Sequence, residues 1–96
     1  MYNIELGKSG LNVPTVAVGC MRISEMDDKQ VSEFIDTALS LGGNFFDHAD
    51  IYGGGKCEEL FGKAIKKLNR QDIIIQTKCG IRKGMYDFSY EHIIFL

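Results

Sequence analysis

Apolar residues recur every three or four positions along two stretches of the chain, which is the spacing of one buried helix face. Asp27 and Gln30 precede the first stretch in the spacing of an N-terminal capping box. Gly42 and Gly43 follow it and predict its end, since glycine accepts the left-handed conformation of a helix C-cap. The apolar positions of the first stretch are Val31, Phe34, Ile35, Ala38 and Leu39. Those of the second are Cys57, Leu60, Phe61, Ala64, Ile65 and Leu68.

Short apolar runs stand before and after these helices and predict β-strands. They are residues 15–19 (TVAVG), 44–47 (NFFD) and 73–78 (IIIQTK). In the second run, Phe45 and Phe46 should face opposite sides of the strand. The three consecutive isoleucines of the third predict burial on both faces, which is typical of parallel sheets.

The two ends of the chain predict smaller elements. Residues 3–14 contain two short strand-like runs around Gly7-Lys8-Ser9-Gly10, which indicates a β-hairpin. Residues 80–88 are expected to form a loop, and Ser89 to start a third helix.

The element order after the hairpin is therefore β, α, β, α, β. Strands that alternate with helices and are buried on both faces predict an α/β fold with parallel strands and right-handed crossovers. Nothing in the pattern covers the far side of the third strand, and an exposed strand edge favours pairing with another chain.

Composition narrows the classes of function. The chain has 96 residues, is 45% hydrophobic and 25% charged, and carries a net charge of −2, which suits one globular domain and argues against nucleic acid or anionic membrane as partner. No apolar run reaches the roughly 20 residues of a membrane helix, and the N-terminus shows no secretory signal. Cys20, Cys57 and Cys79 lack the paired spacing of metal ligands, so we expect free thiols, no metal and a cytoplasmic location.

Three residues whose side chains could take part in catalysis lie at or after the ends of the predicted strands. Functional residues of parallel α/β folds collect at the carboxyl ends of strands. Asp47 ends the second strand, Tyr52 lies five residues later, and Lys78 ends the third strand. On neighbouring strands, about 4.8 Å apart, Asp47 and Lys78 can pair, and Tyr52 can fold back above them. Asp50, further into the loop, is the alternative acid.

Such a trio has a specific use. A phenol is normally too weak an acid for proton transfer near neutral pH, but a neighbouring lysine cation stabilises the phenolate, and an aspartate holds that lysine charged. The result is a proton donor for a carbonyl oxygen, and the matching hydride has to come from a cofactor such as a nicotinamide.

The glycine run at 53–55 suggests a second reading, a phosphate-binding loop. A P-loop requires GxxxxGK followed by Ser or Thr, whereas Cys57 follows Lys56 here. A dinucleotide fingerprint would need glycine where Glu58 stands. The pattern therefore favours a turn into the second helix, with nucleotide binding through Lys56 as the weaker alternative.

The quoted segments resemble the aldo-keto reductase family. LGKSGLNVPTVAVGCMR resembles the family's opening hairpin and first strand, GGNFFDHADIYGGGKCEELFGKAIK its signature around the second strand and helix, and IIIQTKCG its third strand. The resemblance runs from about residue 4 to about residue 94, and the wording DHADIYGGGK is similar to a bacterial oxidoreductase branch.

The resemblance implies a (β/α)8 TIM barrel closed at the bottom by the hairpin, and NADPH-dependent reduction of aldehydes or ketones to alcohols. It makes Tyr52 the proton donor, Lys78 its activating cation and Asp47 the partner of Lys78. It also turns Met21 and Arg22, with Asp47, toward the cofactor.

The resemblance also limits what the chain is expected to do. Residues 1–96 would be a single partial domain, the first three of eight βα units, without the family's catalytic histidine. We therefore expect these 96 residues alone to be inactive. The alternative is a non-catalytic α/β fragment that self-associates through its exposed strand edge.

Overall fold

The computed structural model of the chain describes residues 2–94. The strands are β1 (Asn3–Glu5), β2 (Asn12–Pro14), β3 (Val18–Gly19), β4 (Phe45–Asp47), β5 (Ile74–Gln76), β6 (Ile81–Arg82) and β7 (Met85–Tyr86). The α-helices are α1 (Asp28–Ser40), α2 (Lys56–Ala64) and α3 (Tyr90–Ile94). Short 3-10 turns lie at Ile23–Glu25, Tyr52–Gly55, Ile65–Lys67 and Arg70–Asp72.

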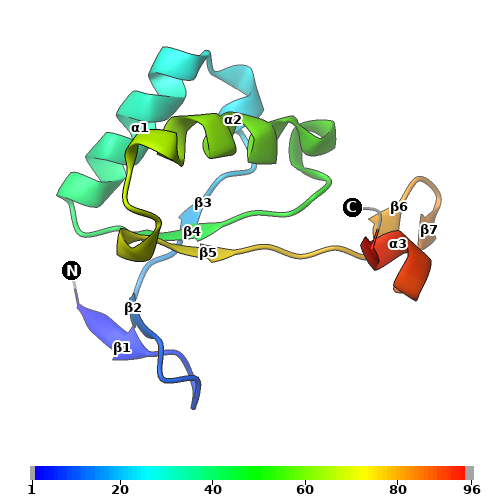
Figure 1. Cartoon of the computed structure of the whole chain (residues 1–96), viewed down its shortest axis with the longest axis horizontal. Helices are drawn as coiled ribbons and strands as arrows, with labels where there is room; N and C mark the ends of the chain where they lie inside the picture. Colours follow the sequence, from blue (N-terminus) through cyan, green and yellow to red (C-terminus); the bar gives the residue numbers. More distant parts are fainter. Residues whose placement is uncertain (1, 95–96) are drawn as a thin grey trace.

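The centre of the fold is a parallel sheet in the order β3-β4-β5, which confirms the predicted parallel pairing. Figure 1 shows α1 and α2 lying together on one face of this sheet. Each helix connects one strand to the next, as the alternation of strand and helix predicted. The architecture is therefore α/β, with β5 at an edge of the sheet.

The hydrophobic core fills the space between the sheet and the two helices. Phe46 of β4 is completely buried, and its ring packs against Phe61 of α2 with centroids 5.0 Å apart. Phe45 is also buried but lies outside this core cluster, as expected for neighbours on opposite faces of a strand. The cluster is made of Cys20, Ile23, Val31, Ile35, Phe46, Cys57, Leu60, Phe61, Ala64 and Ile73.

Helix α1 has the ends that its sequence predicts. Asp27 accepts a hydrogen bond from the backbone N–H of Gln30 at 2.8 Å, and the Gln30 side chain accepts one from the N–H of Asp27 at 3.0 Å. At the other end Gly42 has φ +86°, and the N–H of Gly43 donates to the carbonyl of Ala38 at 2.8 Å. Both ends satisfy backbone groups that a helix leaves unpaired.

The strands are shorter than the apolar runs suggested. The run 15–19 contributes only Val18–Gly19, and the run 73–78 only Ile74–Gln76. The third run also falls short of the predicted burial on both faces: Ile73 is buried, whereas Ile74 and Ile75 are half-buried. Ile73 belongs to the core cluster and Ile75 packs against it, whereas Ile74 does neither, as expected for the alternating sides of a strand.

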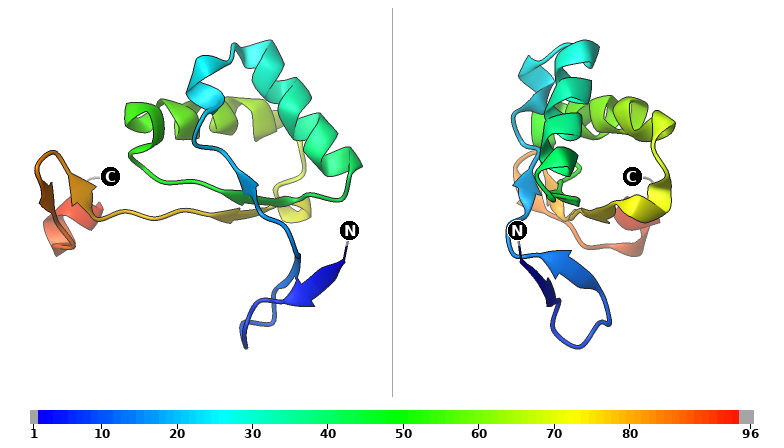
Figure 2. Two further views of the ribbon diagram at one scale, coloured as in Figure 1. Left: turned by 180° about the vertical axis from the view of Figure 1, so that it is seen from behind. Right: turned by 90° about the vertical axis from the view of Figure 1, so that its left-hand side faces the viewer.

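The two ends of the chain lie outside the central layers, as Figure 2 shows. The predicted hairpin is confirmed: β1 pairs antiparallel with β2, and Gly7 and Gly10 of its turn have positive φ. The segment 80–88 is not the plain loop expected, because β6 and β7 form a second small hairpin there. Ser89 starts α3 as predicted, since its hydroxyl accepts the N–H of His92 at 3.2 Å.

Candidate active site

The candidate site lies at the carboxyl ends of the three parallel strands. Gly19 pairs with Asp47 across β3 and β4, and Asp47 pairs with Gln76 across β4 and β5. The chain then leaves each strand at the same level: the N–H of Cys20 donates to the carbonyl of Asp47 at 3.0 Å. Residues that follow the three strands are therefore brought to one edge of the sheet, as the fold class predicted.

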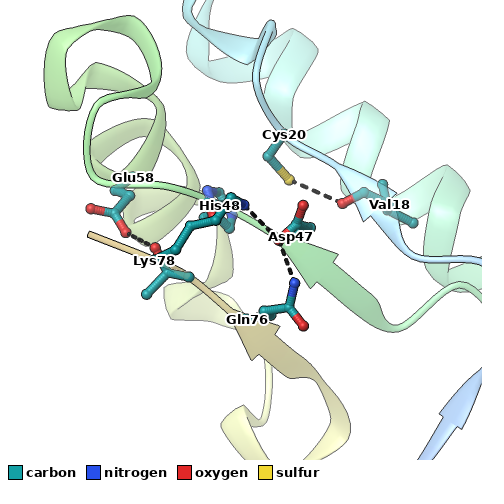
Figure 3. A network of polar contacts seen from close by, with 8 residues as sticks. Val18, Cys20, Asp47, His48, Glu58, Gln76 and Lys78 are labelled. Carbon is teal, nitrogen blue, oxygen red and sulfur yellow. Dashed lines mark hydrogen bonds and ion pairs between the residues drawn. The ribbon is translucent and has the colours of Figure 1, made fainter. Parts of the chain in front are cut away.

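Lys78 is held by two acceptors at the end of β4. Its Nζ donates to Oδ1 of Asp47 at 3.0 Å and to the backbone carbonyl of His48 at 2.7 Å. Figure 3 shows the Lys78 side chain reaching across to this strand end. The Asp47 carboxylate, followed by the Tyr52 phenol, raises the pKa of Lys78, so the lysine stays charged through neutral pH.

Tyr52 lies next to this ion pair. The loop after β4 turns back at Ala49, whose carbonyl accepts the N–H of Tyr52 at 3.1 Å. The Nζ of Lys78 lies 5.0 Å from the centroid of the Tyr52 ring, within the range of a cation–π contact. The structure thus brings Asp47, Tyr52 and Lys78 together, and their roles are proposed below.

Asp47 has a second partner that the sequence reasoning missed. Nε2 of Gln76 donates to Asp47 Oδ1 at 2.8 Å, the same oxygen that receives Lys78. Partial burial by itself raises the pKa of Asp47, but the hydrogen bonds from Lys78 and then Gln76 outweigh it and lower the pKa. The register of β4 and β5 is the signal that would have found Gln76, since it stands directly opposite Asp47.

His48 contributes its backbone rather than its ring. The side chain is 1% exposed and packs edge-on against Phe61, with ring centroids 4.3 Å apart. Neither ring nitrogen has a hydrogen-bond partner among the described residues. Burial lowers the pKa of His48, although the carboxylates of Glu58 and Asp47 oppose the shift. His48 is therefore a buried core residue whose backbone carbonyl, rather than its ring, takes part in the site.

Met21 and Arg22 follow β3 on the same edge of the sheet as Asp47. Both are exposed, and the Met21 carbonyl accepts a hydrogen bond from the Cys57 thiol at 3.3 Å. Asp50, the alternative acid, uses its backbone N–H to bond the carbonyl of Lys78 at 3.1 Å. The ammonium group of Lys78 is bonded to Asp47, so the geometry favours Asp47 as its partner.

The glycine run forms the turn that brings the chain from Tyr52 into α2. Gly53, Gly54 and Gly55 have φ of 60°, 66° and 98°, a conformation that other residues adopt at a cost. A Cβ at Gly53 would lie 2.7 Å from Cβ of Ser24 in the turn after β3. The glycines thus let the Tyr52 loop pack against the neighbouring connection, which supports the reading as a turn.

A cavity of about 260 Å³ opens beside the Tyr52 and Lys78 side chains. Its lining is mostly apolar and includes the charged residues Asp50 and Lys78 and the phenol of Tyr52. The lining residues are Ala49, Asp50, Ile51, Tyr52, Lys78, Cys79 and Ile81. An apolar hollow with a few convergent polar groups is the usual form of a small-molecule site. No helix among residues 2–94 is long and apolar enough to cross a membrane.

Comparison with known proteins assigns the class. The model of the aldo/keto reductase family matches residues 15–94. The chain is 42% identical over 82 residues to the uncharacterized oxidoreductase YqkF of Bacillus subtilis, a match covering 85% of this chain and 26% of that protein. It is 38% identical over 95 residues to L-galactose dehydrogenase of Arabidopsis thaliana, covering 92% and 30%. The chain therefore belongs to the aldo/keto reductase family of oxidoreductases.

A solved structure gives the same assignment for the fold. An aldo-keto reductase from Bacillus halodurans, in its holo form, superposes with a TM-score of 0.83 at 37% identity, over 97% of this chain and 33% of that one. The α/β architecture is thus part of a TIM barrel, as expected. The chain spans only about a quarter to a third of the length of these relatives.

Proposed function

We propose that the chain supplies the proton-donating part of an NADPH-dependent reductase that converts aldehydes or ketones to alcohols. The observation that carries the proposal is the position of the Lys78 ammonium group, 3.0 Å from Asp47 Oδ1 and 5.0 Å from the centre of the Tyr52 ring. The family membership and the reductase and dehydrogenase names among the relatives support it.

Each residue of the trio has one role in this proposal. Tyr52 donates its phenolic proton to the oxygen of the carbonyl substrate. Lys78 stabilises the phenolate that remains, since a cation within a few ångströms favours the charged form of an acid. Asp47 keeps the lysine charged and in place through their hydrogen bond. The mostly apolar cavity wall gives the carbonyl compound a surface to pack against.

The residues present suit the reactive end of a nicotinamide cofactor. When bound, NADPH supplies the hydride that matches the proton from Tyr52. The cavity of about 260 Å³ beside Tyr52 and Lys78 offers a flat ring and a small carbonyl compound an apolar surface. Met21, Arg22 and Asp47 would hold the cofactor, because all three lie at or just after the carboxyl ends of β3 and β4.

The 96 residues form only part of the proposed enzyme. We take residues 1–96 as one partial domain, the first three βα units of the barrel, in a cytoplasmic protein whose three cysteines are free thiols. These residues alone are proposed to lack turnover, because the family's catalytic histidine and most of the cofactor site are not among them. Among residues 2–94 no further strand pairs with the outer edge of β5, and this observation favours self-association as a second property.

A chimeric enzyme tests the catalytic role. The chain would replace its counterpart in the Bacillus halodurans reductase, which it matches over 97% of its length, and NADPH consumption would be followed with an aromatic aldehyde. We expect Tyr52→Phe to lower the rate by roughly 10²–10⁴-fold, the usual contribution of general acid catalysis. Tyr86→Phe is the matched control, because Tyr86 is exposed and lies on β7. An active chimera in which Tyr52→Phe keeps the full rate would refute the proposal.

A further inference from the structure

Gln76 lies directly opposite Asp47 in the sheet. It pairs with Asp47 in the β4–β5 ladder, so the two side chains leave the same face of neighbouring strands. Its Nε2 donates to Asp47 Oδ1 at 2.8 Å, and Figure 3 shows the amide pointing at the carboxylate. The two donors on this oxygen, Gln76 and Lys78, are separated by one residue of the same strand end.

The second donor limits how the carboxylate can turn. The Asp47 side chain is 28% exposed, and rotation about the last bond of an aspartate side chain is only weakly restricted. A carboxylate held by Lys78 alone could swing toward water together with the flexible lysine, which is 50% exposed. The hydrogen bond from Gln76 adds a second donor to Oδ1 from the neighbouring strand, so it restricts the rotation of the carboxylate that binds Lys78.

The hydrogen-bond donors of Lys78 show why the position of Asp47 Oδ1 matters. An ammonium group has three N–H donors, and Lys78 uses one on Asp47 Oδ1 and one on the His48 carbonyl. The third donor remains for the side of the ammonium group where the Tyr52 ring lies, 5.0 Å away. If Asp47 turned away, the lysine would lose one of the two anchors that direct this donor.

We propose that Gln76 is a positioning residue of the site, which holds Asp47 Oδ1 where it binds Lys78 and so keeps the ammonium group beside Tyr52. The inference rests on the proposed function, since it concerns how the same trio is held. Gln76 is exposed at the end of β5, and if it were only a surface residue its replacement would leave Asp47 unchanged.

The experiment follows the Asp47 carboxyl group in the 96-residue chain by carbon-detected NMR titration. The variants are Gln76→Met, which keeps the length of the side chain and removes the donor, and Gln71→Met, the same change at an exposed glutamine before β5. Losing a hydrogen bond to the ionised form makes a carboxyl group easier to protonate. We expect Gln76→Met to raise the pKa of Asp47 and to lower that of Lys78, and Gln71→Met to change neither.

Two further variants separate the possible failures. Lys78→Met should raise the pKa of Asp47 more than Gln76→Met does, because Lys78 is its stronger partner. Gln76→Glu should also raise it, by placing a second carboxylate beside the first. An Asp47 titration that moves with Lys78→Met but not with either Gln76 variant overturns the positioning role and leaves the proposed function standing. An Asp47 pKa that stays the same in Lys78→Met would show that Asp47 and Lys78 do not interact, and would refute both the positioning role and the proposed function.

Discussion

The turn at Gly53 determines how closely the Tyr52 loop approaches the rest of the site, and two adjacent glycines allow its cost to be measured. Gly53 and Gly54 have nearly the same backbone, with φ of 60° and 66°. Alanine in this left-handed region costs about 1–2 kcal/mol at either position. A Cβ at Gly54 meets nothing within 4 Å, whereas one at Gly53 lies 2.7 Å from Cβ and 3.0 Å from Oγ of Ser24.

The difference between the two positions is therefore steric. Overpacking of this kind costs about 1–3 kcal/mol when neighbouring atoms have to shift. We expect Gly54→Ala to lower the free energy of unfolding by about 1–2 kcal/mol and Gly53→Ala by about 2–5 kcal/mol, the sum of the backbone and steric costs. Urea denaturation followed by far-ultraviolet circular dichroism measures both values on the same two-state scale.

A double-mutant cycle isolates the contact with Ser24. Ser24→Gly removes the two nearest of the three atoms that a Cβ at Gly53 would meet and leaves Cys57 Sγ at 3.2 Å. It should therefore recover most, but not all, of the steric cost of about 1–3 kcal/mol in Gly53→Ala. The same substitution should recover nothing in Gly54→Ala. Equal destabilisation by the two alanines, or no coupling between Ser24 and Gly53, would show that the loop does not pack against this turn and would refute the reasoning.

The remaining predictions concern the core, the pH dependence and the isolated chain. In the same urea assay, Phe46→Ala should lower the free energy of unfolding by about 3–5 kcal/mol, because Phe46 is fully buried. The control Phe88→Ala, at a 70% exposed position, should lower it by less than about 0.5 kcal/mol. Equal losses in the two variants would contradict the described core. Burial lowers the pKa of His48, so the folded protein binds fewer protons than the unfolded chain, and its stability should fall as pH drops below about 6.5. His48→Gln should abolish this dependence of stability on pH between about pH 7 and pH 5. An unchanged pH dependence would exclude His48 as its source. Purified chain should show no NADPH consumption with an aromatic aldehyde, and measurable turnover would end that expectation. If the β5 edge self-associates, size-exclusion chromatography should show larger species at higher concentration, whereas a monomer throughout would argue against edge pairing.

Local patterns predicted the elements of this fold well, for physical reasons. The capping box at Asp27 and Gln30 and the left-handed Gly42 need only neighbouring residues, and both are present. The second hairpin was missed because its strands, β6 and β7, have two residues each. Its signal in the sequence is weak: Gly84 has φ +77° in the two-residue connection, but Lys83 before it has no positive φ, so the turn is not one of the types that short hairpins favour.

The sequence predicted those parts of the site that depend on the type of a side chain and its place at the end of a predicted strand. Asp47 was found because it ends β4. Lys78 was found because it ends the run 73–78, although β5 itself ends two residues earlier, at Gln76, because the last residues of the run do not pair in the sheet. The structure brings the two side chains to 3.0 Å. Gln76 was missed because its role depends on the register between β4 and β5, which no single strand encodes. The carbonyl of His48 was missed because a backbone acceptor leaves no trace in residue type.

The central claim is that the Lys78 ammonium group lies close enough to the Tyr52 side chain to act on it, 5.0 Å from the centre of the ring. Nitrogen-detected NMR titration of Lys78 Nζ in the wild type, Tyr52→Phe and the control Tyr86→Phe tests it most directly. Because the phenol helps to raise the pKa of Lys78, Tyr52→Phe should lower that pKa, while Tyr86→Phe should leave it unchanged. A Lys78 pKa that is the same in all three proteins would contradict the account, since Tyr52 could then not be the acid that Lys78 activates.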